Sequence, residues 1–200
     1  MNGRFLLTGT AAAALTLFAW QTVSNTAIPW HNATMRAFQN NDAAVRAIRA
    51  QAPENGVYFA PQGVLAAVSF TPDLADKTRA MGVMLVRQLL IDLAAGVVLS
   101  LVVLRLAATR PVEVAVTLGL AGLATAGIAH LSDWNWYGFA PGYAVVNTID
   151  LTINLFLAGL VLGALKSRAL GSEPAITDEA PAARTRGRIP STIRQPEPKG

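Results

Sequence analysis

Residues 130–154 read HLSDWNWYGFAPGYAVVNTIDLTIN, and the aromatic cluster and apolar run within them decide how this chain folds. Aromatic side chains gather where a membrane meets water, and the cluster supplies an aromatic outer loop with Trp134, Trp136, Tyr137 and Phe139. The apolar run carries Asn147, Asp150 and Asn154, whose spacing places all three on one helical face. Because an ionisable side chain inside a membrane span is costly to keep, Asp150 is a candidate functional residue.

The composition points to a membrane protein. Of 200 residues, 52% are hydrophobic and 14% are charged, whereas soluble domains contain about 25% charged residues. About 20 predominantly apolar residues cross a bilayer, and four blocks reach this length: Phe5–Val23, Gly82–Leu104, Val112–Leu131 and Tyr143–Leu165. The sequence therefore predicts an all-α membrane protein with four transmembrane helices and a small, mostly helical extracytoplasmic segment between the first two.

These blocks divide the chain into four parts. Residues 1–23 form a cytoplasmic start and a signal-anchor helix, 24–81 the extracytoplasmic segment, 82–165 a three-helix membrane region, and 166–200 a disordered cytoplasmic tail. An uncleaved anchor is favoured over a cleaved signal peptide, because the first block is long and ends in the bulky Trp20 and Gln21.

The extracytoplasmic segment contains several short elements. A first helix is expected near Ala33–Phe38 and a second at Ala43–Ala52, capped by Asn41 and Asp42. Val57–Pro61 reads as a short extended run, and Val64–Phe70 is ambiguous between strand and helix. Thr71, Pro72 and Asp73 predict the start of the helix that enters the second span.

Basic residues near the span ends predict the orientation. Lys and Arg concentrate on the cytoplasmic side of short loops, and one side of the predicted bundle carries Arg4, Arg105, Arg110, Lys166 and Arg168. The loop at residues 132–142 has none and contains Asp133. We expect both termini in the cytoplasm, with residues 24–81 and 132–142 outside.

In this topology the intramembrane polar residues form one outward-facing layer. Its members are Arg87, Gln88, Asp92, His130, Asn147, Asp150 and Asn154. Arg87 and Asp150 fall at similar depth, so they could form a structural ion pair, with interhelical hydrogen bonds from the other members. The alternative is an outward-open polar cavity that binds a ligand or relays protons. The alternatives stay open at the level of the sequence.

Small residues predict close helix packing. Gly159 and Gly163 form a Gly-x-x-x-Gly pair in the fourth span, which fits packing within the bundle better than homodimerisation. No catalytic or cofactor motif is present, and the absence of cysteine excludes thiolate sites and disulfides. His31, His130 and Asp133 make a poor metal signature, so no metal is predicted. No cofactor and no nucleic-acid partner are predicted either.

Three short motifs resemble a known group. Ile28-Pro29-Trp30-His31, Gly56-Val57-Tyr58 with Pro61, and residues 135–139 look like a group of small bacterial inner-membrane proteins with a signal-anchor, a Pro-Trp-His outer segment and three further spans. The resemblance covers most of residues 1–165. It implies the bacterial inner membrane and the topology above, and it implies no reaction, ligand or site residue.

Three functions follow as hypotheses. The first is a non-enzymatic interaction, assembly or sensing protein that uses its outer segment and aromatic loop, alone, as a homo-oligomer or with another membrane protein. The second is an oligomeric small-solute or proton carrier or channel that uses Arg87, Asp92 and Asp150. The third is a membrane enzyme with a site at the outer interface, which no sequence motif supports.

Overall fold

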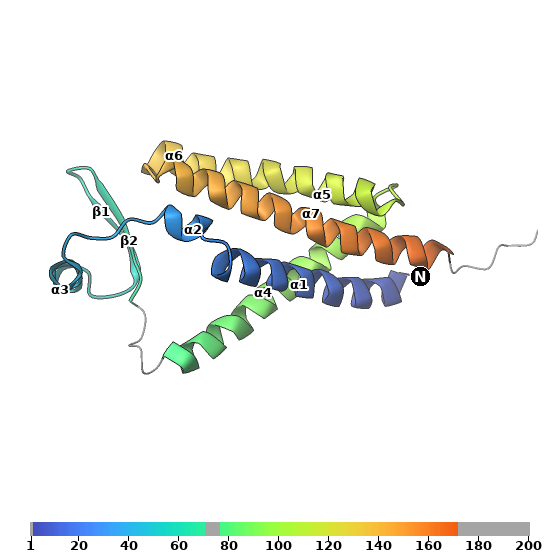
Figure 1. Cartoon of the computed structure of the whole chain (residues 1–200), viewed down its shortest axis with the longest axis horizontal. Coiled ribbons are helices and arrows are strands. Elements are labelled where there is room, and N and C mark those ends of the chain that lie inside the picture. The colour runs from blue at the N-terminus through green and yellow to red at the C-terminus, as the bar shows by residue number, and fades with distance from the viewer. Residues whose placement is uncertain (1, 71–76, 172–200) are drawn as a thin grey trace, which may run out of the picture.

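The computed structural model describes residues 2–70 and 77–171, with four long helices in the order expected (Figure 1). These are α1 (Asn2–Thr26), α4 (Lys77–Arg105), α5 (Pro111–Ala126) with its continuation, and α7 (Pro141–Gly171). Each is long and apolar enough to cross a membrane. Large apolar side chains are exposed along their outer faces, as helices in contact with lipid require. The predicted four-helix membrane fold is confirmed.

Close approach between helices depends on three glycines. A Cβ on Gly159 would lie 2.6 Å from the Ala115 Cα, and one on Gly163 would lie 2.7 Å from the Pro111 Cα, so α7 packs backbone to backbone on α5. A Cβ on Gly96 would lie 2.6 Å from the Thr10 carbonyl oxygen, where α4 crosses α1 obliquely (Figure 1). The Gly-x-x-x-Gly pair therefore acts within the chain, between α5 and α7.

A buried lysine closes the end of α4. The Lys166 Nζ donates a hydrogen bond to the Val103 carbonyl oxygen at 3.0 Å and another to the Leu106 carbonyl oxygen. Val103 lies in the last turn of α4, where carbonyl groups have no partner within the helix, and Leu106 directly follows the end of α4. A cation at this end also complements the helix dipole, so Lys166 of α7 fixes the end of α4.

The third span is longer than predicted. After α5 the helix continues through a π-helical turn, η1 (Gly127–Leu131), and α6 (Ser132–Tyr137). It ends at Gly138, whose φ of +68° is the left-handed conformation that stops helices. The prediction of a loop over residues 132–142 is corrected: most of the aromatic cluster is helical, because residues 132–137 contain neither glycine nor proline.

The segment between α1 and α4 is only partly helical. It contains a single turn, α2 (Trp30–Ala33), then α3 (Asn41–Gln51) and an antiparallel hairpin of β1 (Gly56–Ala60) and β2 (Val64–Val68). The expected helix at 33–38 is wrong beyond Ala33, since the helical turn starts earlier, directly after Pro29. The second helix is present, but the predicted caps Asn41 and Asp42 are corrected: both lie inside α3, and the cap is Asn40, whose side chain accepts from the Ala43 amide at 2.9 Å.

The ambiguous run at 64–70 pairs as a strand because a tight turn precedes it. The Gly63 amide donates to the Ala60 carbonyl oxygen at 3.0 Å, and Gly63 has a φ of +95°. The hairpin stands off one end of the bundle, beside α6 and α2 (Figure 1), and we call this the hairpin end. The predicted helix start at Thr71–Asp73 and the tail from 172 lie outside the described residues.

Replacing Gly159 by Ala will destabilise the bundle. The new methyl group meets backbone atoms of α5 that cannot move aside, an overpacking cost of about 1–3 kcal/mol. We expect a lower midpoint in a denaturant titration of the detergent-solubilised protein. Gly82→Ala is the matched control, because nothing lies within 4 Å of its Cβ position. Equal behaviour of the two variants would contradict the close α5–α7 contact.

Candidate functional site

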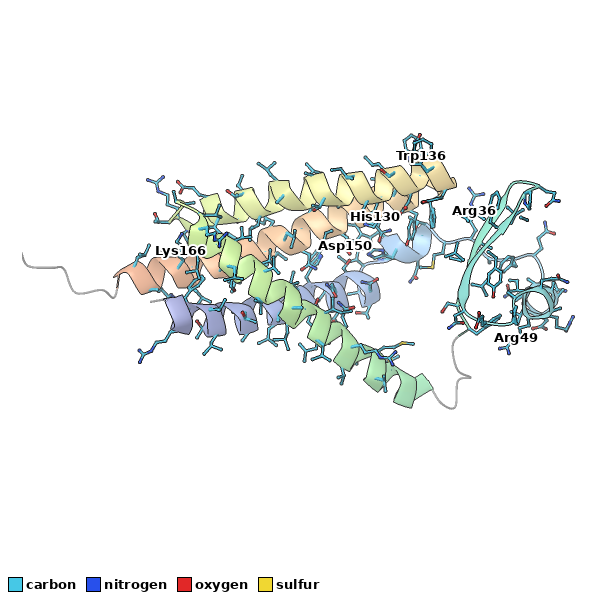
Figure 2. The ribbon with its side chains drawn as sticks, turned by 180° about the vertical axis from the view of Figure 1, so that it is seen from behind. Arg36, Arg49, His130, Trp136, Asp150 and Lys166 are labelled. Atoms are coloured by element: carbon cyan, nitrogen blue, oxygen red, sulfur yellow. The ribbon has the colours of Figure 1, made fainter. Side chains whose placement is uncertain are left out.

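The strongest polar constellation in the bundle surrounds Asp150. Its Oδ1 accepts hydrogen bonds from the Trp20 Nε1 at 2.6 Å and from the Ser24 Oγ at 2.7 Å. Its Oδ2 lies 3.3 Å from the His31 Nε2. We call Trp20, Ser24, His31 and Asp150 the Asp150 cluster. It joins α1, α2 and α7 at the hairpin end of the bundle, where Figure 2 shows Asp150 beside α2.

Ser24 is the centre of the hydrogen-bond network and is fully buried. Its hydroxyl donates to Asp150 and accepts from the Trp30 Nε1 at 3.1 Å. The His31 Nε2 is 3.2 Å from the same hydroxyl oxygen. Because the single Ser24 proton is committed to Asp150, the hydrogen between Ser24 and His31 comes from His31.

This arrangement differs from a nucleophilic relay. In a serine–histidine–aspartate triad, serine and aspartate bind opposite nitrogens of the imidazole. Here Ser24 and Asp150 both contact the Nε2 of His31, and Ser24 donates directly to the carboxylate. No path carries a proton from Ser24 through the ring to Asp150. The geometry favours a cluster that holds segments together.

The local sequence explains how the cluster forms. Trp20 and Ser24 are four residues apart, so they face the same direction from α1. Pro29 then precedes α2, which brings Trp30 and His31 back over the end of α1. The Trp30 ring packs edge-on against the Trp20 ring at 6.4 Å and against the His31 ring at 5.7 Å. This aromatic packing limits the access of water to the hydrogen bonds of Asp150.

Asp92 forms a separate polar group between α4 and α1. Its Oδ1 accepts from the Gln21 Nε2 at 3.2 Å and from the Gln88 Nε2 at 3.0 Å. The predicted polar residues are thus divided between two places. Asp150 joins α7 to α1 and α2, whereas Asp92 and Gln88 join α4 to α1.

The remaining predicted residues join neither group. Arg87 is exposed on α4, and no ion pair in residues 2–70 and 77–171 includes it, so the expected Arg87–Asp150 pair is not formed. The reason is geometric, because the donors of α1 and α2 occupy both oxygens of Asp150. Asn147 donates to the Tyr143 carbonyl oxygen of its own helix at 2.8 Å. His130 lies in the π-helical turn, and its Nδ1 is buried without a partner among the described residues.

The aromatic residues of the third span face outward. Trp134, Trp136 and Tyr137 are exposed on α6, and Trp136 points away from the bundle in Figure 2. Phe139 stacks on Tyr143 with ring centroids 5.5 Å apart. A hollow of about 360 Å³ separates this region from the hairpin and is lined by Val57, Leu65, Ala67, Asp133, Tyr137 and Phe139.

Sequence reasoning missed the partners of both aspartates on α1. Trp20, Gln21 and Ser24 are polar or hydrogen-bonding residues in the last turns of an otherwise apolar span, which was the available signal. Ser24 and Gln21 lie three residues apart and reach different neighbours, α7 and α4. Only the arrangement of the helices shows that these residues, and not Arg87, are the partners of the two aspartates.

The chain was compared with protein-family models, curated proteins and solved structures, and none of them matches it. Within residues 2–70 and 77–171, no group of three or more His, Asp or Glu side chains is placed to hold a metal ion. The chemistry of the site therefore has to be argued from its own residues.

Asp150→Asn will destabilise the protein by about 1.5–3 kcal/mol, the range for hydrogen bonds to a charged group. The substitution keeps the shape of the side chain and removes the charge that strengthens the bonds from Trp20 and Ser24. Unfolding in mixed micelles, followed by tryptophan fluorescence, measures the change. Asp133→Asn is the control, since it removes an equal charge from the partly exposed surface of α6. An unchanged unfolding midpoint for Asp150→Asn would refute the role of the cluster.

Proposed function

We propose that this is a non-enzymatic interaction or sensing protein of the bacterial inner membrane. In this proposal the extracytoplasmic segment contacts the outer surface of the bilayer. A change in this contact then alters the arrangement of the helices through the Asp150 cluster. The observation that carries the proposal is the direct contact of His31, in α2, with Asp150, in α7. A change in the position of the segment would therefore alter the pairing of a charge inside the bundle.

The hairpin offers the interaction surface. Phe59 pairs with Leu65 and Val57 with Ala67 across the two strands, so these side chains share one face of the hairpin. Val57 and Phe59 are each 72% exposed, which is unusual for residues of this size outside a membrane. Val57, Leu65 and Ala67 line the hollow beside Tyr137 and Phe139, so this apolar face is directed toward the end of the bundle.

Lipid is the partner that best fits this face. The aromatic residues of α6 are of the type that lies at headgroup depth, and the hairpin stands next to them at the hairpin end (Figure 1). Arg36 and Arg49 belong to the same segment and are exposed, which suits contact with anionic headgroups (Figure 2). Apolar side chains beside basic ones are typical of segments that lie on a membrane surface.

A dye on the hairpin tests the proposed function. Because the chain has no cysteine, Phe59→Cys gives a single labelling site. An environment-sensitive dye at this site should show blue-shifted emission in nanodiscs that contain anionic lipid. Gln62→Cys, at the exposed tip of the hairpin, is the matched control and should report water. In the Asp150→Asn background the shift should decrease, since the segment loses its attachment. Identical emission at the two sites would contradict the proposal.

The proposed orientation has a test of its own. Reporter fusions after Arg105 should be active in the cytoplasm, and fusions after Trp136 should be active outside. The physical reason is the concentration of Arg4, Arg105, Arg110, Lys166 and Arg168 at the end opposite the hairpin. An external signal from the Arg105 fusion would reverse the topology and place the hairpin in the cytoplasm.

A further inference from the structure

Asp92 is a buried carboxylate within the second candidate span. It lies close to midway between Met81 and Arg105, the ends of its candidate span, and is 2% exposed. Polar groups in hydrocarbon are kept only where they are paired or functional. The Asp150 cluster does not involve Asp92, so its position needs its own explanation.

The hydrogen bonds of Asp92 are all on one oxygen. Gln21 and Gln88 both donate to Oδ1, whereas Oδ2 is buried and has no partner among the described residues. Both donors are neutral amides, and the ion pairs in residues 2–70 and 77–171 do not include Asp92. Asp150 differs, since both of its oxygens have partners and one partner is a histidine. Asp92 is therefore an acceptor without a compensating positive charge.

Further buried polar atoms without a partner among the described residues lie on α1 and on the helices that pack against it. The Oδ1 of Asn154, on α7, is buried without a partner in the described part of the chain, and Asn154 is 2% exposed. Both α4 and α7 pack against α1, which contacts Asp92 through Gln21 and Asp150 through Trp20. At the α1–α4 crossing, the hydroxyl oxygens of Thr10 and Ser100 are also buried and unpaired within the described residues.

We propose that Asp92 is a binding site for a small cation, which is either a proton or an alkali-metal ion. A buried carboxylate with a bare oxygen is costly in an apolar medium, and a bound positive charge removes that cost. The Oδ2 of Asp92 supplies the anionic ligand. Gln21 and Gln88, whose amide nitrogens bind Oδ1, also carry amide oxygens, and these are of the neutral kind that hard cations prefer as ligands.

Infrared spectroscopy of the full-length protein in nanodiscs tests the proton. A protonated carboxyl group gives a carbonyl band that shifts on transfer to D₂O. We expect this band in the wild-type protein, its loss in Asp92→Asn, and its retention in Asp150→Asn and Asp133→Asn. Asp92→Glu restores a carboxyl group and should restore a band, so a folding defect in Asp92→Asn does not decide the result.

Thermal unfolding in sodium chloride and in choline chloride tests the metal ion. If the occupant is an alkali-metal ion, sodium or potassium should raise the midpoint of the wild-type protein and not that of Asp92→Asn. A wild-type protein with neither the band nor a response to the ion overturns the proposal. A band and an ion response that both persist in Asp92→Asn overturn it as well. Both readouts are independent of the dye on the hairpin. The cation site and the proposed function can therefore be refuted independently of each other.

Discussion

The pairing of Asp150 is the interaction on which the arrangement of this protein depends. A charge in the membrane region has to be surrounded by donors, and the donors come from α1 and α2. Meeting that requirement packs the end of α1 against α7 and returns the chain after Pro29 over the bundle. The position of the extramembrane segment, including the hairpin, follows from where α2 is held. The charge specifies geometry more than it adds stability.

The opposite end of the bundle uses the same principle with the opposite sign. Lys166 is buried and donates to carbonyl groups at the end of α4, so one charged side chain of α7 fixes each end of the molecule. Between these ends, the helices are held by close packing. Gly159, Gly163 and Gly96 allow backbones to touch, while the outer faces of the helices remain apolar for lipid. Asp92 is a charged side chain between the two ends of the bundle. Its Oδ2 is buried without a partner among the described residues, and for this reason we propose that it binds a cation.

The spans were predictable because the hydrocarbon core imposes a length and a composition on any helix that crosses it. The four predicted blocks correspond to helices in the structure, although the third continues to Tyr137 and ends only at Gly138. The α3 helix was predictable from the polar residues at its start, although its cap is Asn40 and not Asn41 or Asp42. The run at 64–70 was ambiguous in the sequence, because a short apolar run fits a strand or a helix, and only the pairing of Val64–Val68 with β1 decides between them.

By itself, the sequence determined the membrane class, the four spans and the presence of costly polar residues at Asp92 and Asp150, since these depend on local composition and solvent. The tertiary structure decided which groups those residues meet. The packing of α1 against α4, with its close contact at Gly96, and against α7 brings Gln21 to Asp92 and Ser24 to Asp150, and it leaves Arg87 exposed. Ser24 and Asp150 are 126 positions apart and Gln21 and Asp92 are 71 apart, and no pattern along the chain encodes these contacts. The hydrogen-bonding capacity of each residue is local, whereas its partner is a property of the packed helices.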